Sequence, residues 1–88
     1  MHNMVLVSVF DHAVGEYAPC MCLNSEAAAV RIFTNEVNRY DPNNLLSTNK
    51  TDFSLYVVGE FDLSAGCVVN RDPCAHIVTG KQIGRAHV

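Results

Sequence analysis

The chain has 88 residues, which is enough for one small domain with one core and too few for a second domain. Hydrophobic residues make up 49% and charged residues 17% of the chain, against a globular average of about 25% charged, so the composition predicts a folded protein and excludes a disordered one. The formal net charge of −3 excludes a basic surface over the whole domain, the usual property of nucleic-acid-binding proteins, so any DNA contact must be local.

The start of the chain predicts a β-hairpin. Residues 4–10 (MVLVSVF) have the alternation of a strand, with apolar side chains on both faces. Asp11 and Gly15 supply the turn, because an aspartate accepts nearby backbone N–H groups and a glycine adopts positive φ. Residues 16–23 are predicted to return as a second strand, in which Pro19 suits only an edge or a bulge.

A helix is predicted for residues 27–40, and Asn24 or Ser25 supplies its N-cap. Glu26 lies at the positive end of the helix dipole, and Glu36 and Arg39 have the spacing of an ordinary i,i+3 pair. The apolar stripe of this helix consists of Ala29, Val30, Phe33, Val37 and Tyr40. Asp41-Pro42 ends the helix, and residues 43–51 are predicted to be a connecting loop.

Residues 52–66 (DFSLYVVGEFDLSAG) predict the central strand and a second hairpin. Gly59 inside this strand indicates a bulge or the close approach of another backbone. Asp62 and Gly66 repeat the spacing of Asp11 and Gly15, so both act as turn and scaffold residues. Residues 67–70 are predicted to be a short return strand, and no element is predicted from residue 71 onward.

The predicted order of elements is therefore ββαββ. It gives an α+β fold with a roughly four-stranded antiparallel sheet and one helix packed on one face. Because the first and third strands are apolar on both sides, the second face needs another cover. We expect a homo-oligomer that associates through this face.

The end of the chain has the sequence of an artefact. Residues 83–88 (IGRAHV) match the translation of a common sequencing adapter, ATC GGA AGA GCA CAC GTC, whose next triplet is a stop. We therefore expect residues 1–82 to be one native domain of a metagenomic fragment whose natural C-terminus is missing. Removing Arg85 takes one positive charge from the total of −3 and leaves −4, so the acidic balance remains.

The cysteines allow two interpretations. Together with His76 they provide enough ligands for tetrahedral zinc, although their spacing is not that of a recognised finger or ribbon; they are Cys20, Cys22, Cys67 and Cys74. The alternative is that they are free thiols that behave as small hydrophobic residues in a reducing compartment. We expect the second and predict no metal and no cofactor.

Catalysis is not predicted. Asp11, His12 and Asp62 resemble an acid and base set, yet no nucleophile with spaced partners and no phosphate-binding glycine loop accompanies them. Both aspartates are explained by the two turns. We expect that the protein is not an enzyme.

Two tyrosines are candidates for a DNA-binding surface. Tyr56 lies on the strand face opposite Leu55 and Val57, and Tyr17 lies in the matching hairpin, so the pair can stack on single-stranded bases. The cations that could contact the phosphates are Arg31, Arg39 and Lys50. The alternative is that the tyrosines pack in a dimer interface and the arginines only solvate the helix.

Three motifs, in this order, resemble a known family: VFDHAVGEY, then SEAAAVRIFTNEVN, then DFSLYVVGEFDLSAG. Together they are similar to the small nonstructural protein of gokushovirus-type microviruses, which are phages with single-stranded DNA genomes. The likeness spans residues 5–69 and includes Leu-Tyr-x-x-Gly-x-Phe-Asp-x-x-x-Gly at residues 55–66. The resemblance implies a non-capsid protein that is described as DNA-binding and linked to single-stranded DNA synthesis or packaging. It implies no catalytic residues. The family usually continues past the second hairpin, and we expect that part to be missing or replaced here, together with any basic tail that handles DNA.

Two functional hypotheses follow. The first is a non-enzymatic accessory that binds single-stranded DNA in viral replication or packaging, through Tyr17, Tyr56, Arg31, Arg39 and Lys50. The second is a protein-interaction or oligomerisation module that binds a viral or host protein without contacting DNA. The opening residues have no signal-peptide pattern and no segment reaches transmembrane length, so we expect the host cytoplasm, no membrane contact and no place in the capsid.

Overall fold

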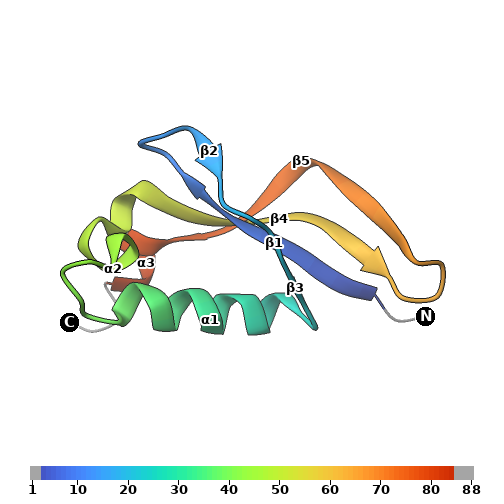
Figure 1. The fold of residues 1–88 in the computed structure, drawn as a ribbon, viewed down its shortest axis with the longest axis horizontal. Helices are drawn as coiled ribbons and strands as arrows, with labels where there is room; N and C mark the ends of the chain where they lie inside the picture. The colour runs from blue at the N-terminus through green and yellow to red at the C-terminus, as the bar shows by residue number, and fades with distance from the viewer. Residues whose placement is uncertain (1–2, 85–88) are drawn as a thin grey trace.

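The computed structural model describes residues 3–84, and the side chains of residues 3–82. The elements are, in chain order, β1 (Asn3–Asp11), β2 (Glu16–Tyr17), β3 (Met21–Leu23), α1 (Glu26–Asn38), α2 (Leu45–Thr48), the 3-10 helix η1 (Lys50–Asp52), β4 (Phe53–Asp62), β5 (Cys67–Thr79) and α3 (Gly80–Gly84). The strands form one antiparallel sheet in the order β2-β1-β4-β5, and β3 also pairs with β1 (Figure 1). The predicted α+β fold, an antiparallel sheet with one main helix, is confirmed.

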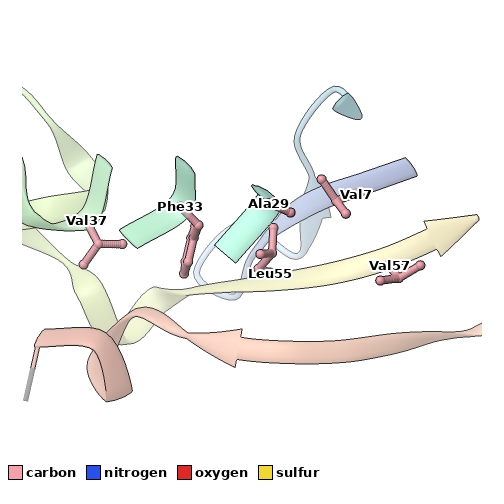
Figure 2. Close-up of a cluster of buried hydrophobic side chains, with 6 residues drawn as sticks. All are labelled: Val7, Ala29, Phe33, Val37, Leu55 and Val57. Atoms are coloured by element: carbon pink, nitrogen blue, oxygen red, sulfur yellow. The ribbon is translucent and has the colours of Figure 1, made fainter. Parts of the chain in front are cut away.

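The core lies between α1 and one face of the sheet. Its buried side chains are Ala29, Phe33 and Val37 from the helix and Val7, Leu55 and Val57 from the two central strands (Figure 2). Burying a Val, Leu or Phe side chain contributes roughly 1.5–3 kcal/mol each, so these few residues supply most of the force that holds the helix on the sheet.

The helix α1 begins where the sequence predicts and ends earlier. The Ser25 side chain accepts a hydrogen bond from the Ala28 backbone N–H at 3.1 Å, so Ser25 is the N-cap. The last helical residue is Asn38, which leaves Tyr40 outside the helix with 91% of its surface exposed. The prediction that Tyr40 belongs to the apolar stripe is therefore wrong, because the stripe loses its periodicity where the helix stops.

The two hairpin turns have the same geometry. In each turn the aspartate Oδ1 accepts two backbone N–H groups, at 3.0 and 3.3 Å for Asp11 and at 2.9 and 3.1 Å for Asp62. The backbone N–H groups of Gly15 and Gly66 donate to the carbonyls of these aspartates at 2.7 and 2.8 Å. Both glycines have positive φ, 82° and 69°, a conformation that other residues adopt at a cost.

Gly59 of β4 lies beside shifts in the pairing register with both neighbouring strands, β1 and β5. The register between β1 and β4 shifts between Leu6 and Val7, and the register between β4 and β5 shifts between Val57 and Gly59. A Cβ atom at Gly59 would lie 2.6 Å from the Val69 carbonyl oxygen, which is closer than real Cβ contacts. The backbone of β5 can therefore approach β4 here only because residue 59 has no side chain.

The strand β5 is much longer than predicted. The predicted return strand covers only residues 67–70, whereas β5 extends to Thr79 and is followed by α3. Val57 pairs with Ala75 and Gly59 with Asn70, so the four residues 71–74 lie opposite the single residue Val58. This large bulge interrupts the side-chain alternation, which is why periodicity gave no signal beyond residue 70.

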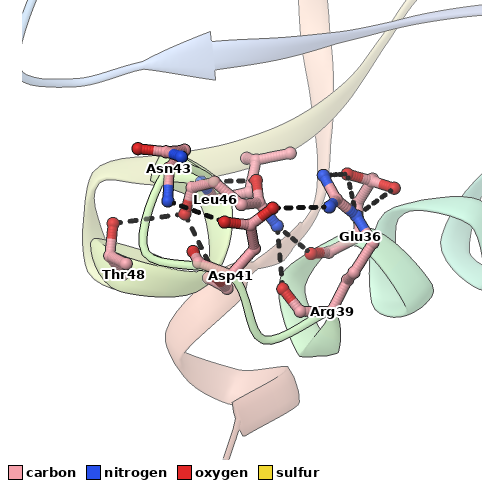
Figure 3. A network of polar contacts seen from close by, with 8 residues as sticks. Glu36, Arg39, Asp41, Asn43, Leu46 and Thr48 are labelled. Carbon is pink, nitrogen blue, oxygen red and sulfur yellow. Dashed lines mark hydrogen bonds and ion pairs between the residues drawn. The ribbon is translucent and has the colours of Figure 1, made fainter.

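The predicted connecting loop, residues 43–51, contains the short helices α2 and η1. Asn44 is buried between α1 and α2, and its Nδ2 donates to the carbonyls of Glu36 at 2.8 Å and Arg39 at 3.1 Å. Its Oδ1 accepts the Leu46 backbone N–H at 3.3 Å, so one side chain caps the end of α1 and the start of α2. Figure 3 shows the polar network of Glu36, Arg39 and Asp41 at this junction.

Within residues 3–84, one face of the sheet is covered by α1 and the other face carries no helix. Directly opposed residues of antiparallel strands share a face, and Val7 opposite Val57 places both on the covered side. Ser8 opposite Tyr56 and Phe10 opposite Tyr17 therefore lie on the other side, which we call the open face. No helix within residues 3–84 is long and apolar enough to cross a membrane.

The molecule is elongated, with extents of 42 × 24 × 20 Å. The hairpin of β4 and β5 projects beyond the start of α1, as Figure 1 shows. We call residues 61–70 of this hairpin the arm. Of the predicted adapter-derived residues, Ile83 and Gly84 form the end of α3, and residues 85–88 lie outside the described part of the chain.

Candidate nucleic-acid interface

Five aromatic rings form a continuous cluster on the open face. Tyr17 of β2 and Tyr56 of β4 have ring centroids 5.6 Å apart with an interplanar angle of 76°. Phe10 of β1 contacts both, at 4.7 Å from Tyr17 and 6.2 Å from Tyr56. His12 lies 4.8 Å from Phe10, and His76 lies 5.3 Å from Tyr56, so an imidazole ends the cluster on each side.

Strand register brings these rings together. The four-residue turn after Asp11 sets Phe10 opposite Tyr17, and β1 pairs with β4 so that Ser8 lies opposite Tyr56. The same pairing continues across β4 to β5, where Tyr56 lies opposite His76. Four strand segments therefore contribute to one surface, and none of these rings belongs to the core beneath α1.

The Tyr17 ring is the most accessible phenol of the cluster, with 46% of the residue exposed. Loss of water around the phenol raises the pKa of Tyr17 above its ordinary value of 10.0, and the Cys74 thiol and the Tyr56 phenol beside it raise it further. The Tyr17 phenol therefore stays neutral across the physiological range and keeps its O–H as a hydrogen-bond donor.

A row of polar groups runs beside the rings. The His12 Nε2 is 2.8 Å from the Ser54 Oγ, which is 2.8 Å from the Thr79 Oγ1, which is 3.0 Å from the His76 Nε2. Ser54 is buried, and His12 is also tied to the sheet by its backbone N–H, which donates to the Asp52 carbonyl at 2.7 Å. The two imidazoles at the ends of the cluster are thus joined by hydroxyl groups as well as by rings.

The structure brings the predicted tyrosines together and leaves the predicted cations elsewhere. Arg31 and Arg39 belong to the α1 side of the sheet, whereas Tyr17 and Tyr56 lie on the open face. Lys50 lines a shallow pocket on the helix side with Val37. The five residues therefore do not form one surface.

Arg39 is already engaged by carboxylates. Its guanidinium contacts Glu36 at 2.9 Å and Asp41 at 3.3 Å, which confirms the predicted i,i+3 pair. The hydrogen bonds that Arg39 donates to Glu36, the negative charge of Glu36 and the nearby Asp41 raise the pKa of Arg39 above the usual value. A phosphate would have to compete with two carboxylates for this side chain.

Four members of the surface were not predicted. Phe10, His12 and His76 complete the aromatic cluster, and Lys81 lines a pocket with His12 and Thr79 near its end. The pairing of Phe10 with Tyr17 was available from the sequence, because a four-residue turn between Asp11 and Glu16 fixes that register. His76 and Lys81 had no such signal, since both follow the bulge in β5.

The cysteines do not converge. All four are free thiols; Cys22 approaches the Met4 sulfur at 3.9 Å, and Cys74 lies beside Tyr17. Within residues 3–84, no group of three or more His, Cys, Asp or Glu side chains is arranged to hold a metal ion.

Comparison with known proteins gives one family. The family model of the Phage ORF5 protein matches residues 4–83, which is most of the chain and includes both hairpins, α1 and β5. No curated protein and no solved structure matches the chain significantly. The chain therefore belongs to the Phage ORF5 protein family.

Proposed function

We propose that this phage protein is a non-enzymatic accessory that binds single-stranded DNA during viral DNA replication or packaging in the host cytoplasm. The observation that carries the proposal is the contact of Tyr17 with Tyr56 inside a cluster of aromatic rings on the sheet face without a helix. The resemblance to the nonstructural protein of gokushovirus-type microviruses supports the same function.

An aromatic surface of this kind favours single strands. Bases in a duplex have both faces stacked, whereas unpaired bases can stack on exposed aromatic side chains, each for roughly 1–3 kcal/mol. Tyr17 offers a partly exposed ring, and its phenol already interacts with the Cys74 thiol beside it. Stacking needs no particular base, so we expect little sequence preference.

Electrostatics contributes less here than in most DNA-binding proteins. The net charge is −3, and near the cluster Lys81 is exposed in the pocket that it shares with His12. Each phosphate that a cation neutralises gives a slope of about −0.7 in a plot of log affinity against log salt. We therefore expect a shallow salt dependence for this domain, with stacking as the main source of affinity.

Fluorescence anisotropy with a labelled oligothymidylate tests the proposal. We expect Tyr17→Ala and Tyr56→Ala each to weaken binding by roughly 5-fold to 100-fold, the equivalent of one stacked base. Tyr40→Ala is the matched control, because Tyr40 is an exposed tyrosine outside the cluster and its loss should leave binding unchanged. Absence of binding at low salt, or equal loss in all three variants, would refute the proposal.

A second function is favoured by a different part of the molecule. The arm carries one formal charge, Asp62, in ten residues, and it exposes three large apolar side chains: Leu63, Val68 and Val69. β5 is also an edge strand of the sheet. We propose that the arm binds a second copy of this chain, because an edge strand pairs with its own copy around a twofold axis without opposing charges.

A further inference from the structure

The polar row beside the aromatic cluster constrains where protons can lie. It contains three short donor–acceptor contacts, from His12 to Ser54, from Ser54 to Thr79 and from Thr79 to His76. A hydroxyl group carries one hydrogen, so the two hydroxyls provide two of the three hydrogens that these contacts need. The third must come from an imidazole Nε2.

The proton count therefore makes the two histidines unequal when both are neutral. One Nε2 carries a hydrogen and donates into the row, and the other Nε2 has none and accepts at the far end. The row has two directions, and reversing it moves the donating role from His12 to His76 without adding or removing a proton. Burial of Ser54 keeps water from replacing the middle contacts.

Adding protons also has unequal consequences. A proton on the Nδ1 of the donating histidine breaks no contact in the row. A proton on the Nε2 of the accepting histidine removes an acceptor and leaves four hydrogens for three contacts. A first added proton therefore keeps all three contacts of the row, and a second would break one of them.

We propose that His12 and His76 form one proton-sharing pair that supplies a single titratable positive charge to the nucleic-acid face. The inference rests on the proposed function for the role of that charge, and the pair itself rests only on the geometry of the row. A negatively charged phosphate beside either end would favour the protonated pair, so affinity for single-stranded DNA rises as the pH falls.

The groups around the pair leave that charge without an acidic partner in any described contact. His12 is faced by Phe10 of β1, by the Asp52 backbone carbonyl of η1 and by Lys81 of α3. His76 is faced by Tyr56 of β4, with Tyr17 of β2 and Cys74 of β5 beside that ring. The Asp11 carboxylate next to His12 is held by the backbone of its own turn.

Nitrogen chemical shifts of the histidine rings test the pair without DNA. At pH 8 we expect one of the two rings to carry its hydrogen on Nε2 and the other on Nδ1. Thr79→Val and Ser54→Ala interrupt the row and remove the requirement that the two rings differ, so the tautomer of at least one ring should change. The exposed turn substitution Ser64→Ala should change neither ring. Finding the same tautomer in both rings of the wild-type protein would overturn the pair.

Binding of an oligothymidylate measured at a series of pH values tests the role of the charge. One shared proton predicts an affinity that rises by at most about tenfold per pH unit. His12→Gln or His76→Gln alone should keep a one-proton dependence, because the remaining imidazole can still take up the charge. Only the double substitution should abolish it. A slope near two protons would show independent imidazoles and overturn the proposal.

The two measurements separate the two claims. If the tautomers are unequal but the protein binds no DNA at any pH, the proposed function is refuted, and with it the role of the charge in DNA binding. Proton sharing between the two histidines is then still supported. If the protein binds DNA with an affinity that does not depend on pH, the proposed function is retained and the role of the histidine charge in binding is refuted.

Discussion

At the scale of single residues, Gly59 shows how the absence of a side chain fixes the sheet. A Cβ atom added to Gly59 would lie 2.6 Å from the Val69 carbonyl oxygen. This oxygen belongs to the backbone and cannot rotate away as a flexible side chain could. We expect Gly59→Ala to lower the free energy of unfolding by about 1–3 kcal/mol, the usual cost of overpacking. Chemical denaturation measures this change directly.

Gly66 provides the matched control for Gly59. It has positive φ and open space around its Cβ position, so the cost of an alanine there is backbone strain of about 1–2 kcal/mol. Asparagine tolerates this conformation, so Gly66→Asn should recover stability that Gly66→Ala loses. Gly59→Asn should not recover it, and a Gly59→Ala protein as stable as wild type would contradict the close approach.

Residue types alone predicted part of the candidate site. The alternation of residues 53–58 placed Tyr56 on the face opposite Leu55, and the matching turns placed Tyr17 near it. The ion-pair partners of the arginines were harder to predict from the sequence, because a guanidinium pairs with the carboxylates that are nearest in space. Arg39 contacts both Glu36 and Asp41, and only the contact with Glu36 could be predicted from helix spacing.

At the scale of elements, Asn44 joins the end of α1 to the start of α2. Its buried amide satisfies two carbonyls at the end of α1 and one N–H at the start of α2. We expect Asn44→Ala to lower the free energy of unfolding by about 1–3 kcal/mol, because three backbone groups lose a partner. Thermal or chemical denaturation would measure it.

Asn44→Asp distinguishes capping from simple packing. An aspartate keeps an oxygen for the Leu46 N–H and replaces the donating amide with a carboxylate facing two carbonyl oxygens. Asn44→Asp should therefore lower the free energy of unfolding as much as Asn44→Ala does, although aspartate fills the same volume as asparagine. Full stability of Asn44→Asp would mean that the contacts to α1 contribute little.

The elements that the sequence missed are those whose periodicity is short or interrupted. α2 has four residues, which is about one helical turn, too few to show an apolar stripe. β5 has thirteen residues, yet the bulge at residues 71–74 separates its two alternating parts. The long uninterrupted elements, β1, α1 and β4, were all predicted within a few residues of their observed bounds.

At the scale of the whole molecule, the fold divides its two candidate surfaces between opposite ends of the sheet. The aromatic cluster lies near the turn between β1 and β2, and the arm lies around the turn between β4 and β5. Figure 1 shows these two turns. Because β1 and β4 are antiparallel, with Asn3 opposite Asp62 and Asp11 opposite Phe53, these turns are at opposite ends. Self-association through the arm would therefore leave the cluster free for DNA.

Light scattering after size exclusion at micromolar concentration tests that division. We expect the wild-type protein to be a dimer or a larger oligomer. Val68→Asp should reduce the measured mass to the 9.7 kDa of one chain, because a twofold axis through the arm would bring two new carboxylates together. Val14→Asp is the control: Val14 is a similarly exposed valine, 67% against 59%, in the turn at the other end, and its substitution should leave the mass unchanged. A wild-type monomer would exclude the arm as a self-association surface, and a monomeric Val68→Asp that still binds oligothymidylate would show that the two surfaces act independently.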